Sequence, residues 1–301
     1  MVSSHDKIIA HRLALGTVQL GMPYGVANSS GQPSEETACN IIAAAWQEGI
    51  FYYDTARSYG ESEAVLGRCF QRLNSKQEPL IITKLAPGLT EPEQVLESIQ
   101  KSLDNLKQSS LWGVLLHREE MLDHWHDLWE PALHEARSRG LLLHAGVSVY
   151  SPARALQSLE CRGLDLIQLP ANVFDRRMAR SGFFNKVKTH VITVFIRSIY
   201  LQGLALLDPA KIPAHLKFAR KALVTLNSFC HEHNLDKQSF LIHYLLFRYP
   251  QAVLLFGAET AEQVRQNCTL TKKNALALQI CDLWDQVWPE DNERLVNPTL
   301  W

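Results

Sequence analysis

The sequence lacks the features that mark several common classes of protein. Its 301 residues contain 30 Lys and Arg against 31 Asp and Glu, so no excess of positive charge attracts nucleic acid or an anionic membrane. The longest apolar stretch, residues 240–247, is interrupted by His243 and is too short to cross a bilayer. Residues 1–6 have neither the basic nor the apolar segment of a secretory signal. These absences predict a soluble, cytoplasmic protein with a small-molecule partner.

Cysteine is present, but it is not arranged for metal binding. There is no CxxC pair and no His/Cys cluster at zinc spacing. The six cysteines are scattered, at Cys39, Cys69, Cys161, Cys230, Cys268 and Cys281. We therefore expect no metal site and a reducing compartment. Hydrophobic residues make up 46% of the chain and charged residues 20%, which is the balance of an ordinary globular protein.

Short apolar runs recur eight times, each bounded by turn residues and followed by a segment with helical periodicity. Most are nearly continuous in Val, Ile, Leu and aromatic residues, which is typical of parallel strands covered on both faces. The predicted strands are residues 13–17, 50–54, 80–84, 112–117, 144–148, 165–169, 191–197 and 253–257.

Amphipathic helices are predicted between these strands. In the first, Ser34 is placed to cap the N-terminus, Glu35 and Glu36 suit its positive end, and Gly49 ends it. Another has apolar residues at three- and four-residue spacing between Val95 and Leu106. The remaining helices are predicted near residues 61–72, 123–139, 152–159, 180–189, 214–233, 236–248 and 260–270.

Eight strands that alternate with helices predict the α/β class and a (β/α)8 TIM barrel. The chain has about the usual length of one such barrel and no linker rich in Pro, Gly or Ser, so we expect a single domain over residues 1–301. A doubly wound open sheet is the alternative. It would normally bring a Gly-rich turn after the first strand, and the sequence has none there.

Polar residues close three consecutive strands, at the end where a barrel carries its active site. Asp54, Lys84 and His117 end the second, third and fourth strands, and Tyr59 follows Asp54 by five residues. Hydride transfer to a carbonyl carbon leaves negative charge on oxygen, so a proton donor is needed there. Tyr59 can donate if Lys84 lowers its pKa from about 10. Asp54 would keep Lys84 charged, and His117 would orient the carbonyl oxygen.

Each of these four residues alone also has a structural explanation, as a turn cap, a solvated strand end, a core histidine or a turn tyrosine. Their joint occurrence at the same ends of adjacent strands favours catalysis. The segment from Asp54 to Gly67, together with the residues around Lys84 and His117, resembles the aldo-keto reductases. This similarity extends over nearly the whole chain. It implies a barrel enzyme that reduces aldehydes or ketones with NADPH or NADH, through an Asp/Tyr/Lys/His tetrad and without a metal.

The resemblance also implies a set of cofactor-binding residues. Ser148 and Gln168 would hold the nicotinamide carboxamide, and the helix that starts near Thr260 offers N-terminal amides to a phosphate. The loop after the seventh strand would line the diphosphate through Ser198, Leu201 and Gly203. The adenosine end would meet Gln263 and Asn267. Further residues fall in segments that match the family's cofactor-binding motifs, namely Gly16, Thr17, Arg197, Gly257 and Glu259.

Three departures from the family pattern concern the cofactor. Val149 stands where many members have Asn, and Arg197 stands where an aromatic residue commonly stacks on the nicotinamide. A guanidinium plane can also stack on a ring. Members that prefer NADPH place Lys or Arg near the 2′-phosphate, whereas this chain has Glu259, with Arg265 as a compensating cation on the same helix. A carboxylate repels a phosphate, so we expect NADH to be used at least as well as NADPH.

Two other functions are compatible with these residues. A nicotinamide-binding regulatory or sensor protein would keep the barrel with little turnover. An aldolase or isomerase would form a Schiff base on Lys84, but a lysine kept charged by Asp54 is a poor nucleophile. Neither substrate nor oligomeric state follows from the sequence. Specificity is expected in residues 18–33, 118–123, 171–182, 198–213 and 285–301. Within them we select four pocket candidates, Met22, Tyr24, Phe174 and Arg176.

Overall fold

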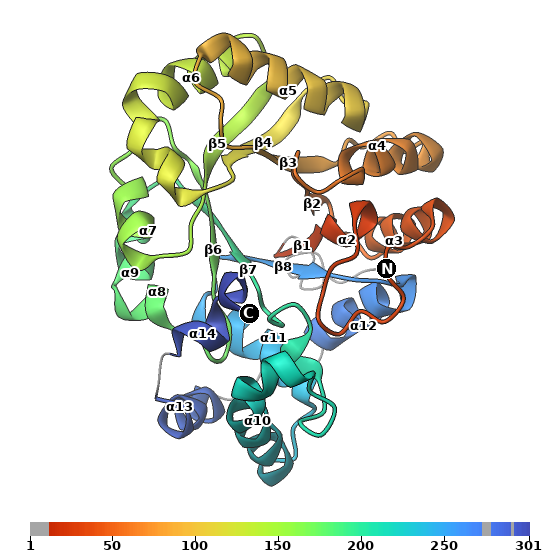
Figure 1. The fold of residues 1–301 in the computed structure, drawn as a ribbon, viewed down its shortest axis with the longest axis vertical. Coiled ribbons are helices and arrows are strands. Elements are labelled where there is room, and N and C mark those ends of the chain that lie inside the picture. The colour runs from red at the N-terminus through yellow and green to blue at the C-terminus, as the bar shows by residue number, and fades with distance from the viewer. Residues whose placement is uncertain (1–11, 273–277, 290–291) are drawn as a thin grey trace.

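Eight parallel strands close into a barrel in which each strand pairs with the next and β8 pairs with β1 (Figure 1). The computed structural model describes residues 12–272, 278–289 and 292–301. Residues 1–6, where no signal is predicted, and two residues of the 285–301 segment lie outside these ranges. The strands are β1 (Leu13–Gly16), β2 (Tyr52–Asp54), β3 (Leu80–Leu85), β4 (Leu111–Leu116), β5 (Leu142–Ser148), β6 (Leu166–Pro170), β7 (Thr193–Arg197) and β8 (Val253–Gly257). The predicted (β/α)8 barrel is therefore confirmed, and every predicted strand is present.

Helices surround the barrel, as Figure 1 shows. The N-terminal half contributes α2 (Val18–Gly21), α3 (Glu35–Gln47), α4 (Ser62–Leu73), α5 (Pro92–Leu106) and α6 (Glu130–Ser138). The C-terminal half contributes α7 (Pro152–Ser158), α8 (Arg177–Arg180), α9 (Phe183–Lys186), α10 (Arg220–Glu232), α11 (Lys237–Arg248), α12 (Ala261–Thr271), α13 (Leu278–Val287) and α14 (Glu293–Val296). The predicted cap of α3 is confirmed, because the Ser34 hydroxyl accepts a hydrogen bond from the Thr37 backbone amide at 3.2 Å.

Some helix predictions need correction. The helix predicted over residues 123–139 is in fact a 3-10 segment (Glu119–His124), a π segment (Trp125–Trp129) and then α6. Pro131 lies in the first turn of α6, where proline is tolerated because the backbone N–H that it lacks would have no partner within the helix. The helix predicted over 180–189 is interrupted at Gly182, whose φ is +80°. The segment 285–301 is not merely a loop, because it contains the end of α13 and all of α14.

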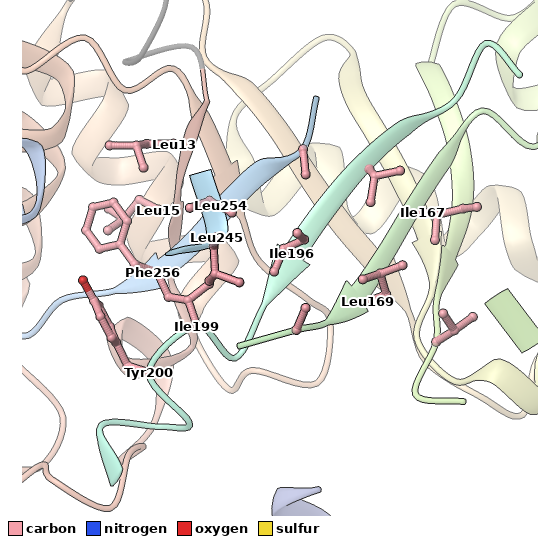
Figure 2. Packing of buried hydrophobic residues seen from close by; sticks show 14 of the residues in the cluster. Leu13, Leu15, Ile167, Leu169, Ile196, Ile199, Tyr200, Leu245, Leu254 and Phe256 are labelled. Atoms are coloured by element: carbon pink, nitrogen blue, oxygen red, sulfur yellow. The ribbon is translucent and has the colours of Figure 1, made fainter. Parts of the chain in front are cut away.

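Apolar side chains form two layers, one on each face of the strands. Alternate residues of a strand point to opposite faces, so one set fills the barrel and the other meets the helices. Figure 2 shows the outer set, with Leu13 and Leu15 on β1 and Leu254 and Phe256 on β8, near Leu245 of α11. The set with the opposite alternation forms a separate buried cluster of Ala14, Ile82, Leu115, Leu166, Phe195, Val253 and Leu255, against which Tyr52 and Trp112 pack. This inner cluster closes the barrel below the ends of its strands.

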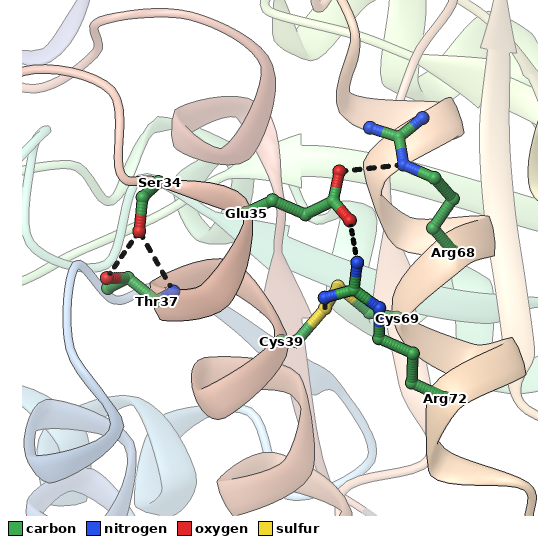
Figure 3. The surroundings of a disulfide bond; sticks show 7 residues. All are labelled: Ser34, Glu35, Thr37, Cys39, Arg68, Cys69 and Arg72. Atoms are coloured by element: carbon green, nitrogen blue, oxygen red, sulfur yellow. Dashed lines mark hydrogen bonds and ion pairs between the residues drawn. A yellow bond between two sulfur atoms is a disulfide. The ribbon is translucent and has the colours of Figure 1, made fainter.

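Two of the six cysteines form a disulfide, between Cys39 on α3 and Cys69 on α4 (Figure 3). Glu35 lies beside it and makes ion pairs with Arg68, at 2.8 Å, and with Arg72. The other four cysteines are free and buried. The spacing of the cysteines in the sequence therefore did not reveal that two of them are paired. With a disulfide present, the cysteines no longer support the expectation of a reducing compartment. Among the described residues, no helix is long and apolar enough to cross a membrane.

Candidate active site

The predicted site residues occupy the next inward-facing position along their strands, beyond the inner apolar cluster. Asp54 lies two residues after Tyr52, Lys84 two after Ile82, and Arg197 two after Phe195. This alternation directs their side chains into the barrel mouth at the C-terminal ends of the strands. There they line one cavity of about 340 Å³. The same cavity is lined by Tyr59, His117, Ser148, Gln168 and Gly257.

A buried ion pair lies at the base of this cavity. The ammonium Nζ of Lys84 donates hydrogen bonds to Asp54 Oδ1 at 2.7 Å and Oδ2 at 2.6 Å, and to the Thr55 carbonyl at 2.9 Å. Gln168 Nε2 also donates to Asp54 Oδ1, at 2.7 Å. Burial lowers the pKa of Lys84, whereas the Asp54 carboxylate acts to raise it. Asp54 thus holds the lysine in place, as the sequence predicted.

Tyr59 is fixed above this pair by a close backbone contact. A Cβ on Gly21 would lie 1.9 Å from the Tyr59 carbonyl oxygen, and a Cβ on Gly60 would lie 2.3 Å from the Gly21 carbonyl oxygen. Gly60 also has a φ of +54°. Lys84 Nζ lies 5.0 Å from the centroid of the Tyr59 ring, and the His117 ring lies 5.7 Å from it at a steep angle. The four predicted tetrad residues are therefore neighbours.

The electrostatics of Tyr59 differ from the sequence-based prediction. Burial raises the pKa of Tyr59, the Asp54 carboxylate raises it further, and the Arg197 guanidinium lowers it. We expected Lys84 to be the cation that lowers this pKa. Lys84 donates to both oxygens of Asp54, so the opposing charge of that carboxylate accompanies any effect of the ammonium on the phenol. Arg197 is the cation whose charge favours the phenolate.

His117 is neutral at physiological pH. Its pKa is lowered to about 4, first by burial and then by the positive charges of Lys84, Arg197 and Arg118. The Nδ1 atom of His117 lies 3.1 Å from the Ser58 hydroxyl, which can donate to it. Under that assignment, Nε2 carries the proton. The imidazole then presents a hydrogen-bond donor without a charge.

We call the part of the cavity that holds Tyr59 and His117 its reaction end. The remaining predicted residues extend from there towards α12. Ser148 donates weakly to Gln168 Oε1, at 3.5 Å. Gly16, Thr17, Glu259, Gln263 and Asn267 also line the cavity. The Gln263 side chain accepts from the Glu259 amide at 2.7 Å, and Asn267 Oδ1 accepts from Tyr200 and from Gln238. Leu201 does not line the cavity, because its side chain is fully buried in the core.

The loop after β7 contains an unusual concentration of left-handed backbone. Ser198, Leu201 and Gln202 have φ values of +62°, +49° and +56°, and Gly203 has +89°. Non-glycine residues rarely adopt this conformation, and it concentrates where a site constrains the backbone. A Cβ on Gly203 would lie 2.6 Å from the Ala27 Cβ, so the chain passes there without room for a side chain. Ser198 and Gly203 line the cavity.

Of the four pocket candidates, only Tyr24 lines the cavity. Phe174 packs in the core against Trp284 and Trp288. Arg176 pairs with Asp285 and donates to the Trp288 carbonyl, while Met22 lies on the surface. These three predictions are wrong because sequence position within a loop does not specify which way a side chain points.

Gln19 lines the cavity from the predicted 18–33 segment, whereas other lining residues were not predicted, among them Tyr150, Gln238 and Gln266. Tyr150 could have been found, because it lies two residues after Ser148 and continues the inward alternation. Its ring stacks on the Arg197 guanidinium, with the carbon Cζ 3.8 Å from the ring centroid. Arg265, the proposed compensating cation, does not line the cavity and pairs with Glu262 at 3.7 Å.

The sequence matches the family model described as Aldo/keto reductase family over residues 12–288. "Aldo-keto reductase YhdN" of Bacillus subtilis is 26% identical over 207 residues, which cover 65% of this chain and 60% of that protein. An aldo-keto reductase of Mycobacterium avium is 34% identical over 155 residues, covering 48% and 52%. The chain thus spans about 60% or less of the length of these curated relatives.

Solved structures resemble the chain over more of its length. The aldo-keto reductase AKR11C1 of Bacillus halodurans, in its holo form, has a TM-score of 0.75 at 19% identity, covering 92% of this chain and 91% of that one. The glycerol dehydrogenase AKR11B4 of Gluconobacter oxydans has a TM-score of 0.73 at 20% identity, covering 95% and 92%. These likenesses show that the fold is shared.

Proposed function

Because this chain belongs to the aldo/keto reductase family, we propose that it reduces an aldehyde or ketone to an alcohol with a nicotinamide cofactor. The observation that carries the proposal is the convergence of Asp54, Tyr59, Lys84 and His117 in one cavity at the C-terminal ends of the strands. Convergent polar groups in such a cavity are the expected form of an active site.

In this proposal each member of the tetrad has a separate task. The cofactor, when bound, supplies hydride to the carbonyl carbon. Tyr59 donates the proton to the carbonyl oxygen, and neutral His117 donates a hydrogen bond that orients that oxygen. Asp54 holds Lys84 so that its Nζ stays 5.0 Å from the centroid of the Tyr59 ring. The Asp54 bond also makes Lys84 unsuitable for Schiff-base chemistry.

The lining of the cavity fits a nicotinamide dinucleotide. Ser148 and Gln168 offer hydroxyl and amide groups suited to a carboxamide. Ser198 and Gly203, on the left-handed loop after β7, would line the diphosphate, together with the N-terminus of α12, where Thr260 caps the helix by accepting from the Gln263 amide at 3.2 Å. We assign the adenosine end to Glu259, Gln263 and Asn267.

We propose that NADH is used at least as well as NADPH. The cavity near α12 is lined by Glu259, Gln263, Gln266 and Asn267, and the lining contains no Lys or Arg there. A 2′-phosphate would meet a carboxylate without a compensating cation. Dissociation constants from the fluorescence of the two reduced cofactors test this, and Glu259→Gln should strengthen NADPH binding more than NADH binding. A strong preference of the unaltered protein for NADPH would contradict it.

Tyr59→Phe tests the catalytic assignment. Loss of the proton donor should lower the rate of carbonyl reduction by roughly 10²- to 10⁴-fold without weakening NADH binding. Tyr53→Phe is the matched control, because Tyr53 is buried, bonds to the Ile50 carbonyl and does not line the cavity. Full turnover by Tyr59→Phe would refute the assignment. A protein that binds NADH but reduces none of a broad aldehyde panel would instead favour the sensor function.

A further inference from the structure

Arg197 is a charged residue in the cavity whose partners are all neutral. The other charged residues of the lining are Asp54, Lys84 and Glu259, and Lys84 is paired with Asp54. Arg197 donates from Nη2 to the Val149 carbonyl at 3.2 Å and from Nη1 to the Ser198 hydroxyl at 3.3 Å. Among the residues that the structure describes, no carboxylate forms an ion pair with it. A partly buried cation with only neutral partners has lost part of its hydration without gaining a negative charge beside it. An anion bound there would therefore be stabilised.

The Arg197 guanidinium acts on the reaction end of the cavity. Its positive charge opposes the burial that raises the pKa of Tyr59 and Tyr24, and it contributes to the lowered pKa of His117. The Asp54–Lys84 pair is neutral as a unit, and His117 is uncharged at neutral pH. The reaction end therefore carries a net positive charge, and that charge is Arg197.

Tyr150 holds the guanidinium in a defined orientation. The carbon Cζ of Arg197 lies 3.8 Å from the centre of the Tyr150 ring, which is the distance of a direct stack. A guanidinium stacked on one face keeps its N–H groups in the plane, where they can form a bidentate pair with a planar oxyanion. Two of those N–H groups are used by Val149 and Ser198, which leaves others available to a ligand.

We propose that Arg197 binds a carboxylate of the carbonyl substrate, so that the preferred substrates are aldehydes or ketones that carry an acid group. This inference rests on the proposed function and names the substrate class of the same site. The acid group neutralises Arg197 while the carbonyl oxygen meets Tyr59 and His117. The cofactor diphosphate is the other group that could neutralise Arg197, because we assign the diphosphate to Ser198, which follows Arg197 in the chain. We favour the substrate because the Arg197 guanidinium stacks on Tyr150 and donates to the Val149 carbonyl, directly after Ser148 at the end of β5, and not beside the N-terminus of α12.

Matched acids and esters test the proposal with the whole protein and NADH. Suitable pairs are 4-carboxybenzaldehyde with methyl 4-formylbenzoate, succinic semialdehyde with its methyl ester, and glyoxylate with ethyl glyoxylate. We expect kcat/KM to favour the acid by at least about tenfold in one or more pairs, which is the effect of ~1.4 kcal/mol of differential binding. Arg197→Met should abolish this preference, through KM more than kcat. Arg197→Lys should retain part of the preference for the acid, because lysine keeps the positive charge but cannot form two parallel N–H bonds to a carboxylate.

Arg118→Met is the matched control, because Arg118 also acts electrostatically on His117 but is exposed and does not line the cavity. It should leave the acid-to-ester ratio as in the unaltered protein. Benzoate, which cannot be reduced, provides a readout independent of turnover. It should quench the fluorescence of the NADH complex, and Arg197→Met should weaken that binding by tenfold or more.

Three results would overturn the proposal: esters reduced as well as acids, an Arg197→Met variant that keeps the acid preference, or one that loses NADH affinity with an unchanged ratio. The last result would assign Arg197 to the cofactor, at its nicotinamide or at its diphosphate. Failure of the proposed function looks different, since neither acids nor esters would then be reduced. Benzoate binding that depends on Arg197 would still support the anion site in that case.

Discussion

Lys84 donates to both carboxylate oxygens of Asp54, at 2.7 and 2.6 Å, and the two residues are only 1% and 3% exposed. Two charges removed from water in this way stabilise each other only while both are present. The pair is also electrically neutral as a unit. The ion pair therefore fixes the position of Lys84 next to Tyr59. The positive charge that favours the Tyr59 phenolate comes from Arg197.

Asp54→Asn should destabilise the fold by about 3–5 kcal/mol, because it leaves the Lys84 charge buried without its partner. Lys84→Met should also destabilise it, and the double variant should lose less than the sum of the two single variants. Urea unfolding followed by circular dichroism measures the three free energies. Glu135→Gln, at the exposed pair with Arg139, is the control and should have a far smaller effect. Additive losses at Asp54 and Lys84 would show that the two charges are not coupled.

His117 should titrate at about pH 4, well below the ordinary value of 6.5. The folded state then binds fewer protons than the unfolded state between these values, so His117's contribution to stability is complete above pH 6.5 and is lost as the pH falls towards 4. The ring resonance of His117, assigned by comparison with His117→Gln, should show no transition near pH 6.5 in an NMR titration. A midpoint between 6 and 7 would contradict both the pKa and the neutral role of the imidazole. Arg118→Met removes one repelling charge and should raise the midpoint.

The positions of three of the four proposed tetrad residues could be predicted because they depend on local sequence. A strand has a two-residue period, so the residue that ends an apolar run also has a predictable face, as Asp54 and Lys84 illustrate. The closure of the barrel then brings neighbouring strand ends together. His117, directly after β4, and Gln168 on β6 follow the same rule.

Features that depend on the meeting of separate segments could not be predicted. The stack of Arg197 on Tyr150 joins the ends of β7 and β5, and the disulfide joins α3 to α4. The strand alternation places Tyr150 and Arg197 at the cavity but does not indicate that they stack, and no motif marks the disulfide. Phe174 follows β6 as closely as a site residue would, yet it turns away from the cavity to pack against Trp284. Loop direction is decided by tertiary packing.

Gly21→Ala should lower kcat/KM by about 10²-fold, the effect that a misplacement of ~1 Å has on reacting groups. The added Cβ would lie 1.9 Å from the Tyr59 carbonyl oxygen and 2.4 Å from the Ser62 amide nitrogen, so the segment that carries Tyr59 must move. Gly140→Ala is the control for backbone strain: its added Cβ meets nothing within 4 Å, its φ is +72°, and it does not line the cavity, so it should lower the melting temperature without changing the kinetics. Steady-state kinetics and the melting temperature should be measured for both. Gly21→Ala with unaltered kinetics would show that this contact does not position Tyr59.

The disulfide between Cys39 and Cys69 should stabilise the oxidised protein, because it closes a loop of 30 residues between α3 and α4. The chain-entropy model gives roughly 3–4 kcal/mol for a loop of this size. Cys39→Ser should therefore lower the free energy of unfolding under oxidising conditions by about that amount. Dithiothreitol should lower the stability of the unaltered protein similarly and leave the variant unchanged.

Thiol titration in denaturant provides the matching chemical count. The oxidised protein should react at four cysteines and the reduced protein at all six, since four are free. Six reactive thiols in protein purified without reductant would show that the bond does not form under those conditions. The stability difference and the thiol count must change together, because the same covalent bond determines both.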